Sequence, residues 1–174
     1  MYQRQAKAPV GDPTTYRMPA KPFAISDDFW IEDGAGRPAF VVDGEAARTH
    51  RTLVIKDDGG GERYRVQRRV TWLRTTMVVE TPRGSAASVH PVLLRPARRR
   101  LAVDLASGPT WKIEGSIEDH EYDIHGPYRK VASISKRQPD AADTYTVEVA
   151  PGEDAALVLA VTVVADHLAD TAGR

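Results

Sequence analysis

Four arginines, Arg95, Arg98, Arg99 and Arg100, form the densest cluster of side chains in this sequence that could do chemistry. A guanidinium group makes two parallel hydrogen bonds to a phosphate, so these arginines are candidate ligands for an anionic lipid head group. Each basic residue near an anionic membrane surface contributes about 1 kcal/mol. The alternative is that the arginines are solvated and pair with carboxylates elsewhere in the chain, and the pattern favours this simpler interpretation.

The arginine cluster belongs to a basic middle part of a chain that is neutral overall. The 174 residues hold 24 Lys and Arg against 24 Asp and Glu. Residues 48–112 carry 14 basic and 5 acidic side chains, whereas residues 113–174 carry 5 basic and 12 acidic ones. Because a neutral chain has little long-range attraction to a polyanion, we expect no nucleic-acid partner. Within the acidic part, the strand-like run at 121–125 is a candidate surface for recognition of another protein.

Two histidines, His120 and His125, lie among four carboxylates within residues 118–123 and raise the question of a metal site. In a strand, alternation directs Tyr122 and Ile124 toward a core and places the polar residues at 121, 123 and 125 on the outer face. Neighbours on one face are about 6.6 Å apart along a strand, which is poor geometry for one small ion. The pattern is that of an exposed strand, and we expect no metal site.

Motifs for catalysis are absent from the sequence. It contains no Gly-x-Ser-x-Gly turn, no Gly-rich phosphate loop ending in Lys and Ser or Thr, and no His-Glu-x-x-His pair. It has no cysteine, which excludes a thiolate nucleophile or a thiolate metal ligand. The acidic, glycine-rich segment at 57–62 lacks the ligand spacing of a calcium loop and is typical of a hairpin turn. We therefore expect a protein that is not an enzyme and that needs no cofactor.

Short alternating runs separated by Gly or Pro turns fill most of the chain, a pattern typical of an all-β barrel or sandwich. The predicted strands are twelve runs, at 23–25, 29–33, 37–42, 51–56, 62–69, 75–80, 86–92, 100–105, 111–115, 121–125, 129–136 and 143–149. On the run at 62–69, alternation predicts Arg63, Arg65 and Arg69 on one face and Arg68 on the other.

The last apolar segment breaks this pattern. Residues 155–165 are uncharged, but eleven residues fall short of the roughly 17–25 that a membrane-spanning helix needs. Proline and carboxylates at 151–154 suit a helix N-terminus. The β-branched valines also permit a buried strand, but the sixteen residues of Glu153–Leu168 exceed the usual strand length of about 4–8. We predict a helix over these sixteen residues, buried on every face because it is apolar on every face.

The aromatic residues of the strand-like runs are predicted to pack in the core around this helix. They are Trp30, Trp72, Trp111, Tyr122 and Tyr145. A small-molecule carrier is a further alternative, since barrels of few strands can hold a ligand. A helix through the middle would occupy that space, which disfavours the carrier.

An ordered set of segments resembles the LURP-one-related family, in what we interpret as a bacterial-type member. The segments that carry the resemblance are Phe23–Asp33, Phe40–Gly44, Thr52–Asp57, Thr75–Met77, Gly115–Ile124, Val131–Lys136, Asp143–Val149 and the apolar terminal segment. The resemblance implies the fold of the Tubby C-terminal domain and the phospholipid scramblases. That fold is a closed barrel of twelve antiparallel strands around one hydrophobic C-terminal helix, and it agrees with the pattern above.

The resemblance also sets the expected domain boundaries. We expect a barrel domain over residues 16–168, a disordered N-terminal leader over residues 1–15 and a disordered tail over residues 169–174. The leader is polar and has no apolar stretch of signal-peptide length, which makes the cytoplasm the expected location. We expect a monomer without a transmembrane segment.

Two functions follow as hypotheses. The first is a non-enzymatic barrel module that binds anionic phospholipid or phosphoinositide head groups at a membrane surface through Arg95, Arg98, Arg99 and Arg100. Tubby domains bind phosphoinositides and scramblases are linked to lipid movement, but no lipid-binding residue of Tubby can be matched to a position here. The alternative is a regulatory or structural protein-interaction domain without affinity for lipid.

Overall fold

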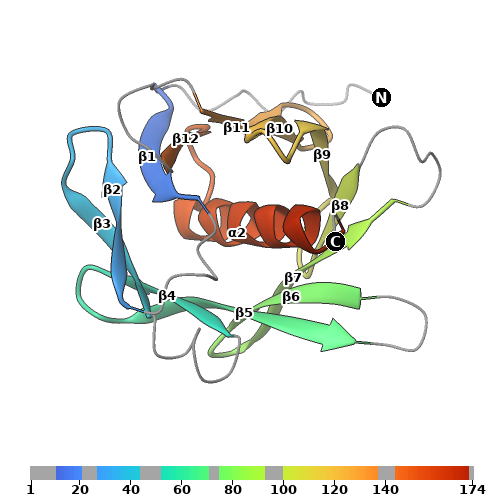
Figure 1. Cartoon of the computed structure of the whole chain (residues 1–174), viewed down its shortest axis with the longest axis horizontal. Coiled ribbons are helices and arrows are strands. Elements are labelled where there is room, and N and C mark those ends of the chain that lie inside the picture. The colour runs from blue at the N-terminus through green and yellow to red at the C-terminus, as the bar shows by residue number, and fades with distance from the viewer. Residues whose placement is uncertain are drawn as a thin grey trace, which may run out of the picture.

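The structure of the protein is a computed structural model that describes residues 11–20, 27–43, 52–70, 75–92, 100–136 and 144–172. Strands dominate, and a single long helix follows the last of them (Figure 1). The elements are β1 (Thr14–Pro19), β2 (Phe29–Asp33), β3 (Pro38–Asp43), β4 (Leu53–Asp57), β5 (Glu62–Val70), β6 (Thr75–Thr81), β7 (Gly84–Pro91), β8 (Leu101–Leu105), β9 (Trp111–Ser116), β10 (Glu121–His125), β11 (Lys130–Ser135), β12 (Thr144–Val149) and α2 (Ala155–Ala172).

The twelve strands form a closed antiparallel barrel in which each strand pairs with its neighbours in the sequence. The barrel closes between β1 and β12, in a register that places Thr14 opposite Val149 and Pro19 opposite Thr144. Closure leaves no free sheet edge, which is where a sheet protein would otherwise pair with other chains. The fold class predicted from the sequence is confirmed.

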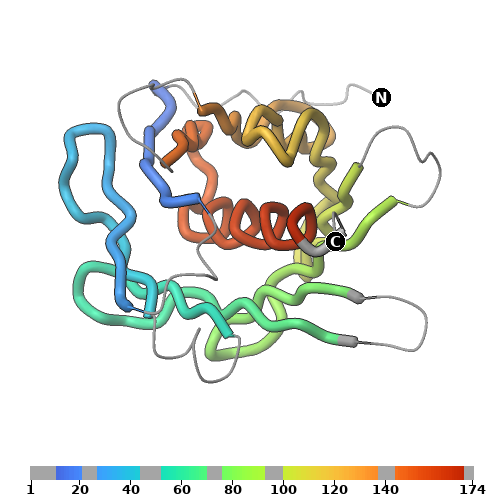
Figure 2. Tube along the Cα trace, viewed as in Figure 1, coloured from blue at the N-terminus to red at the C-terminus, as the bar shows by residue number. Residues whose placement is uncertain are grey.

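Helix α2 runs through the middle of the barrel, with the strands curving round it (Figures 1 and 2). Asp154 caps its first turn, because the Asp154 carboxylate accepts a hydrogen bond from the Leu157 amide at 3.2 Å. The eight residues Val158–Ala165 have no exposed surface on any face of the helix. The predicted buried helix is therefore confirmed, and the alternative of a buried strand is wrong.

Alternation along each strand supplies the inner layer of the core. Inward residues such as Ile31, Val66, Ile113 and Val147 are fully buried, and they belong to one cluster with the helix residues. At about 25 cal/mol for each Å² of apolar surface removed from water, this layer and the helix surface are the main source of stability. The barrel interior is thus a packed core built on α2.

Two boundaries and one aromatic residue differ from the prediction. Strand β1 starts at Thr14, inside the predicted leader, because its backbone pairs with β12; the predicted first strand at 23–25 lies outside the described residues. Helix α2 continues to Ala172, into the predicted tail. Trp30 is 48% exposed, because β2 directs Ile31, and not Trp30, toward the core.

The other predicted core aromatics divide into two groups. Trp111, Tyr122 and Tyr145 are buried, as predicted. Trp72 lies outside the described residues.

Candidate functional site

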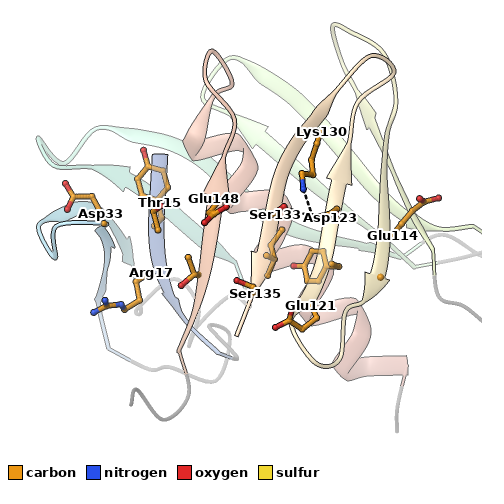
Figure 3. A pocket seen from close by; sticks show the side chains of 16 residues that line it. Thr15, Arg17, Asp33, Glu114, Glu121, Asp123, Lys130, Ser133, Ser135 and Glu148 are labelled. Atoms are coloured by element: carbon orange, nitrogen blue, oxygen red, sulfur yellow. Dashed lines mark hydrogen bonds and ion pairs between the residues drawn. The ribbon is translucent and has the colours of Figure 1, made fainter. Parts of the chain in front are cut away.

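A groove of about 790 Å³ lies on the outer face of the barrel, across six strands that are consecutive around the ring: β2, β1, β12, β11, β10 and β9 (Figure 3). Its lining is polar and carries five carboxylates against two cationic groups. The carboxylates belong to Asp33, Glu114, Glu121, Asp123 and Glu148. The cations are those of Arg17 on β1 and Lys130 on β11, which lie well apart in the groove (Figure 3).

Strand register brings the groove residues together. Glu148 on β12 lies opposite Thr15 on β1 and opposite Ser133 on β11. Ser133 in turn lies opposite Asp123 on β10, and Asp123 lies opposite Glu114 on β9. Directly opposite residues on one face have Cβ atoms about 4.5–5.5 Å apart, so these five side chains form one continuous row across five strands. Residues distant in the sequence thereby make a single polar surface.

The inner faces of the same strands hold this row in place. Tyr122 and Ile134 point inward, where they are 4% and 2% exposed, and Val147 is fully buried. Because side chains alternate between faces, their neighbours Asp123, Ser133 and Glu148 must point outward. The apolar core therefore fixes the direction of the groove side chains.

The carboxylates differ in how far they are already engaged. Asp123 accepts a hydrogen bond from the Ser133 hydroxyl at 2.6 Å, and one of its oxygens lies 3.5 Å from Lys130 Nζ. Glu121 accepts a hydrogen bond from the Lys136 amide at 3.0 Å. Glu148 is exposed and has no hydrogen bond or ion pair with any described residue. Glu148 is thus the most available negative charge in the row, and it lies near the middle of the groove (Figure 3).

Asp33 forms one rim of the groove and is held by the turn that follows β2. Its carboxylate accepts hydrogen bonds from the amides of Ala35 and Arg37 and from Arg37 Nε, at 2.9, 3.0 and 2.9 Å. The hydrogen bond from the Arg37 amide is the main reason why the pKa of Asp33 is lowered. The rim therefore stays negatively charged at neutral pH and below it.

The arginines singled out in the sequence are only partly within the described residues. Arg95, Arg98 and Arg99 lie outside them. Arg100 is exposed immediately before β8, and its Nε lies 3.8 Å from Glu114 Oε1. At this position the arginine pairs with a carboxylate of the acidic part of the chain, as the simpler interpretation expected.

The arginines of β5 follow the predicted alternation. Arg63, Arg65 and Arg69 lie on the outer face, and Arg68 has the inward register but is exposed at the end of the strand. Each of the three outer arginines has a carboxylate within 4.0 Å: Arg63 faces Asp154, Arg65 faces Glu62 and Arg69 faces Glu80. These arginines therefore have carboxylate partners within the chain.

The two histidines lie on different sides of the wall. His125 is on the outer face, 4.0 Å from Asp123. His120 turns inward from the β9–β10 turn with a φ of 53°, in the left-handed region that residues other than Gly seldom adopt. Its ring stacks on that of Tyr145, with centroids 4.5 Å apart. No group of three or more His, Cys, Asp and Glu in the described part of the chain is placed to hold a metal ion.

Sequence reasoning missed a buried polar cluster around Asp166, which lies in the C-terminal half of α2. Asp166 is 6% exposed and accepts hydrogen bonds from the hydroxyls of Tyr145 at 2.6 Å and Tyr122 at 3.2 Å. His120 Nδ1 lies 3.3 Å from the same carboxylate but makes no hydrogen bond with a described residue. Burial, followed by the nearby Asp166 charge, raises the pKa values of both tyrosines. A carboxylate at the end of an all-apolar run was the signal for this cluster.

Within the part of the chain that the structure describes, we find no helix with both the length and the apolar character needed to cross a bilayer.

Comparisons with known proteins identify the fold and a family. The family model described as LURP-one-related matches residues 14–166. The crystal structure of a protein from Arabidopsis thaliana is similar over 90% of this chain and 91% of that chain, with a TM-score of 0.63 and 18% sequence identity. At that identity the likeness extends to the fold alone. A search of curated proteins gave no match.

Proposed function

Since this chain belongs to the LURP-one-related family, whose Tubby-like barrel it has, we propose that it is a non-enzymatic module that binds a basic polypeptide segment in its outer groove. The observation that carries the proposal is the lining of the groove, in which five carboxylates meet two cations and Glu148 has no partner among the described residues. The proposal develops the protein-interaction hypothesis, because a phosphate group would meet repulsion in this groove, whereas a basic side chain would be attracted to it.

The chemistry of the groove defines the segment that it suits. Lysine or arginine side chains would pair with the carboxylates, and the hydroxyls of Thr15 and Ser133 beside Glu148 would bind further donors. Exposed ion pairs contribute about 0.2–1 kcal/mol each, so several are needed for micromolar affinity. We therefore expect binding that weakens with salt and that follows charge more than sequence.

The test is titration of the full chain with a fluorescent peptide of alternating Lys and Ser, read by anisotropy, with a Glu and Ser peptide as the comparison. Glu148→Gln should weaken binding of the basic peptide roughly 2–5-fold, the equivalent of one lost ion pair. Asp58→Asn is the matched control: it removes the same charge from an exposed turn outside the groove and should leave binding unchanged. Equal affinity for both peptides would overturn the proposal.

Binding of anionic lipid through Arg95, Arg98, Arg99 and Arg100 is the second candidate. It is supported by the Arg100 side chain, which is 57% exposed although it lies near Glu114, and by the excess of basic residues in 48–112. A protein acting in this way would reside in the cytoplasm, at the inner surface of the membrane. The arginines would pair with head-group phosphates without insertion into the bilayer.

Vesicle co-sedimentation separates the two candidates. Lipid binding predicts pelleting with vesicles that contain phosphatidylglycerol or phosphoinositide, weaker pelleting at higher salt, and none with neutral vesicles. Reversal of two arginines, Arg98→Glu with Arg99→Glu, should abolish it. A protein that binds the basic peptide and no vesicle supports the groove and excludes the lipid candidate.

A further inference from the structure

The two strands at the centre of the acidic groove and a strongly basic strand lie on opposite walls of the barrel. The groove is centred on β11 and β12, and β5 and β6 lie on the far side of the closed ring. Figure 1 shows the same arrangement, with β11 and β12 above α2 and β5 and β6 below it. One molecule therefore presents an acidic surface and a basic surface in opposite directions.

The basic surface is the outer face of β5. Arg63, Arg65 and Arg69 point away from the core, with side chains 47%, 39% and 66% exposed. Arg68 has the inward register and is exposed at the end of the strand. Outer-face neighbours at i and i+2 are about 6.6 Å apart along a strand. We call Arg63, Arg65 and Arg69 the arginine stripe.

The partners of the arginine stripe within the chain leave it able to bind elsewhere. Strands β5 and β6 together hold four arginines, those of the stripe and Arg68, against two carboxylates, those of Glu62 and Glu80. A third carboxylate, that of Asp154, lies outside these strands and 4.0 Å from Arg63. The ion pairs of Glu62 with Arg65 and of Glu80 with Arg69 are 3.0 and 3.2 Å long; the first is half-buried and the second is exposed, and exposed ion pairs are weak. The positive charge of this wall and the excess of negative charge of the groove therefore lie on opposite sides of the molecule.

We infer that the groove of one molecule takes the arginine stripe of a second copy of this chain. The inference rests on the proposed function, since it names the basic segment that the groove binds. Guanidinium groups can pair with the Glu148 carboxylate in two-bond geometry, and the hydroxyls beside it accept further hydrogen bonds. The chain supplies both of the complementary charges, since its 24 basic side chains equal its 24 acidic ones in number.

The geometry fixes the type of assembly. Because the two surfaces differ and lie on opposite walls, the contact joins unlike surfaces, and each molecule keeps one of each free for the next copy. Such contacts give rings or open chains, not two-fold dimers. Assembly should grow with protein concentration and dissolve as salt shortens the range of electrostatic attraction.

Sedimentation velocity of the full chain tests the inference, at about 20 mM and about 300 mM salt, where screening differs strongly. We expect oligomers at low salt and monomers at high salt. Glu148→Lys or Arg69→Glu should each weaken assembly on the order of tenfold. Arg83→Glu is the matched control, because Arg83 is exposed in the turn after β6 and lies outside the arginine stripe. It should assemble like the wild type.

Mixing the two defective variants gives the sharpest result. The intact groove of Arg69→Glu can still take the intact stripe of Glu148→Lys, so the mixture should form complexes of the two variants that neither variant forms alone. A wild type that stays monomeric at low salt but binds the basic peptide overturns self-association and leaves the proposed function standing. Failure of both measurements overturns both. Assembly unchanged by both variants also overturns the inference.

Discussion

Replacement of Tyr145 by Phe should destabilise the protein more than any other removal of a single tyrosine hydroxyl from this cluster. The Tyr145 hydroxyl donates a 2.6 Å hydrogen bond to Asp166, inside the barrel, where Tyr145 is 2% exposed. Without it, the buried carboxylate keeps, among the residues that the structure describes, the longer hydrogen bond from Tyr122 and the nearby His120 ring. Water cannot readily replace the lost donor at this depth.

The size of the effect follows from this geometry. Hydrogen bonds to charged groups contribute about 1.5–3 kcal/mol to stability, and neutral ones about 0.5–1.5 kcal/mol. We expect Tyr145→Phe to lower the free energy of unfolding by about 1.5–3 kcal/mol. Tyr122→Phe should lower it by less, because the hydrogen bond from Tyr122 to Asp166 is longer, at 3.2 Å. Combining Tyr145→Phe with Asp166→Ala should give a coupling energy of about 0.5–3 kcal/mol, because the two groups contact each other.

Urea unfolding at neutral pH, followed by far-UV circular dichroism, measures these differences. With an m-value of about 2 kcal/mol/M, the expected loss for Tyr145→Phe shifts the midpoint by roughly 1 M. Tyr128→Phe is the control, because Tyr128 is 92% exposed in the β10–β11 turn, and it should stay within about 0.5 kcal/mol of the wild type. A Tyr145→Phe protein as stable as this control would refute the view that the hydroxyl anchors the helix.

Three further predictions concern other parts of the same framework. The pKa values of Tyr122 and Tyr145 are raised in the folded state, so their neutral hydroxyls contribute fully to the free energy of unfolding below the unfolded pKa of about 10. This contribution is lost as the pH rises above that value. Unfolding curves measured at alkaline pH should show the loss, and Tyr145→Phe should make it smaller. Gly115→Ala should lower the melting temperature sharply, since a Cβ there would lie 2.7 Å from Tyr122 Cα at a φ of 134°; equal melting temperatures would contradict the close approach of β9 and β10. Asp154→Ala should lower the free energy of unfolding in urea by about 1–3 kcal/mol, because it removes the cap of α2 and the carboxylate that accepts the 2.6 Å hydrogen bond of the Tyr64 hydroxyl. A decrease of less than about 0.5 kcal/mol would argue against both roles.

The two candidate functions and the self-association make separable demands on the surface. Peptide binding depends on the groove alone, self-association on the groove and the arginine stripe, and lipid binding on Arg95, Arg98, Arg99 and Arg100. Glu148→Lys, Arg69→Glu and Arg98→Glu with Arg99→Glu therefore form a set in which each assay responds to a different combination. All three contacts are electrostatic, so salt dependence alone cannot tell them apart, and the variants must do so.

The periodicity of apolar residues in the sequence by itself predicted the buried side of the strands and the buried helix. The alternation of Tyr122 and Ile124 with polar residues predicted which side of β10 is buried, because the side-chain period of a strand is two. The apolar run at 155–165 predicted a helix surrounded by protein, because no face of it could meet water. The family resemblance added the closure of the barrel, which β1 and β12 accomplish through contacts far apart in the sequence.

Only the tertiary structure decided which surface residues act together. Glu148, Ser133 and Asp123 form one row because β12, β11 and β10 pair in a particular register, and a shift by one residue would send these side chains to the other face. The meeting of Tyr145 and Asp166 likewise required the helix to lie inside the closed wall. Local pattern decides whether a side chain points in or out, whereas long-range packing decides which side chains meet. For this reason the sequence predicted the barrel and the helix, but neither the groove nor the buried cluster.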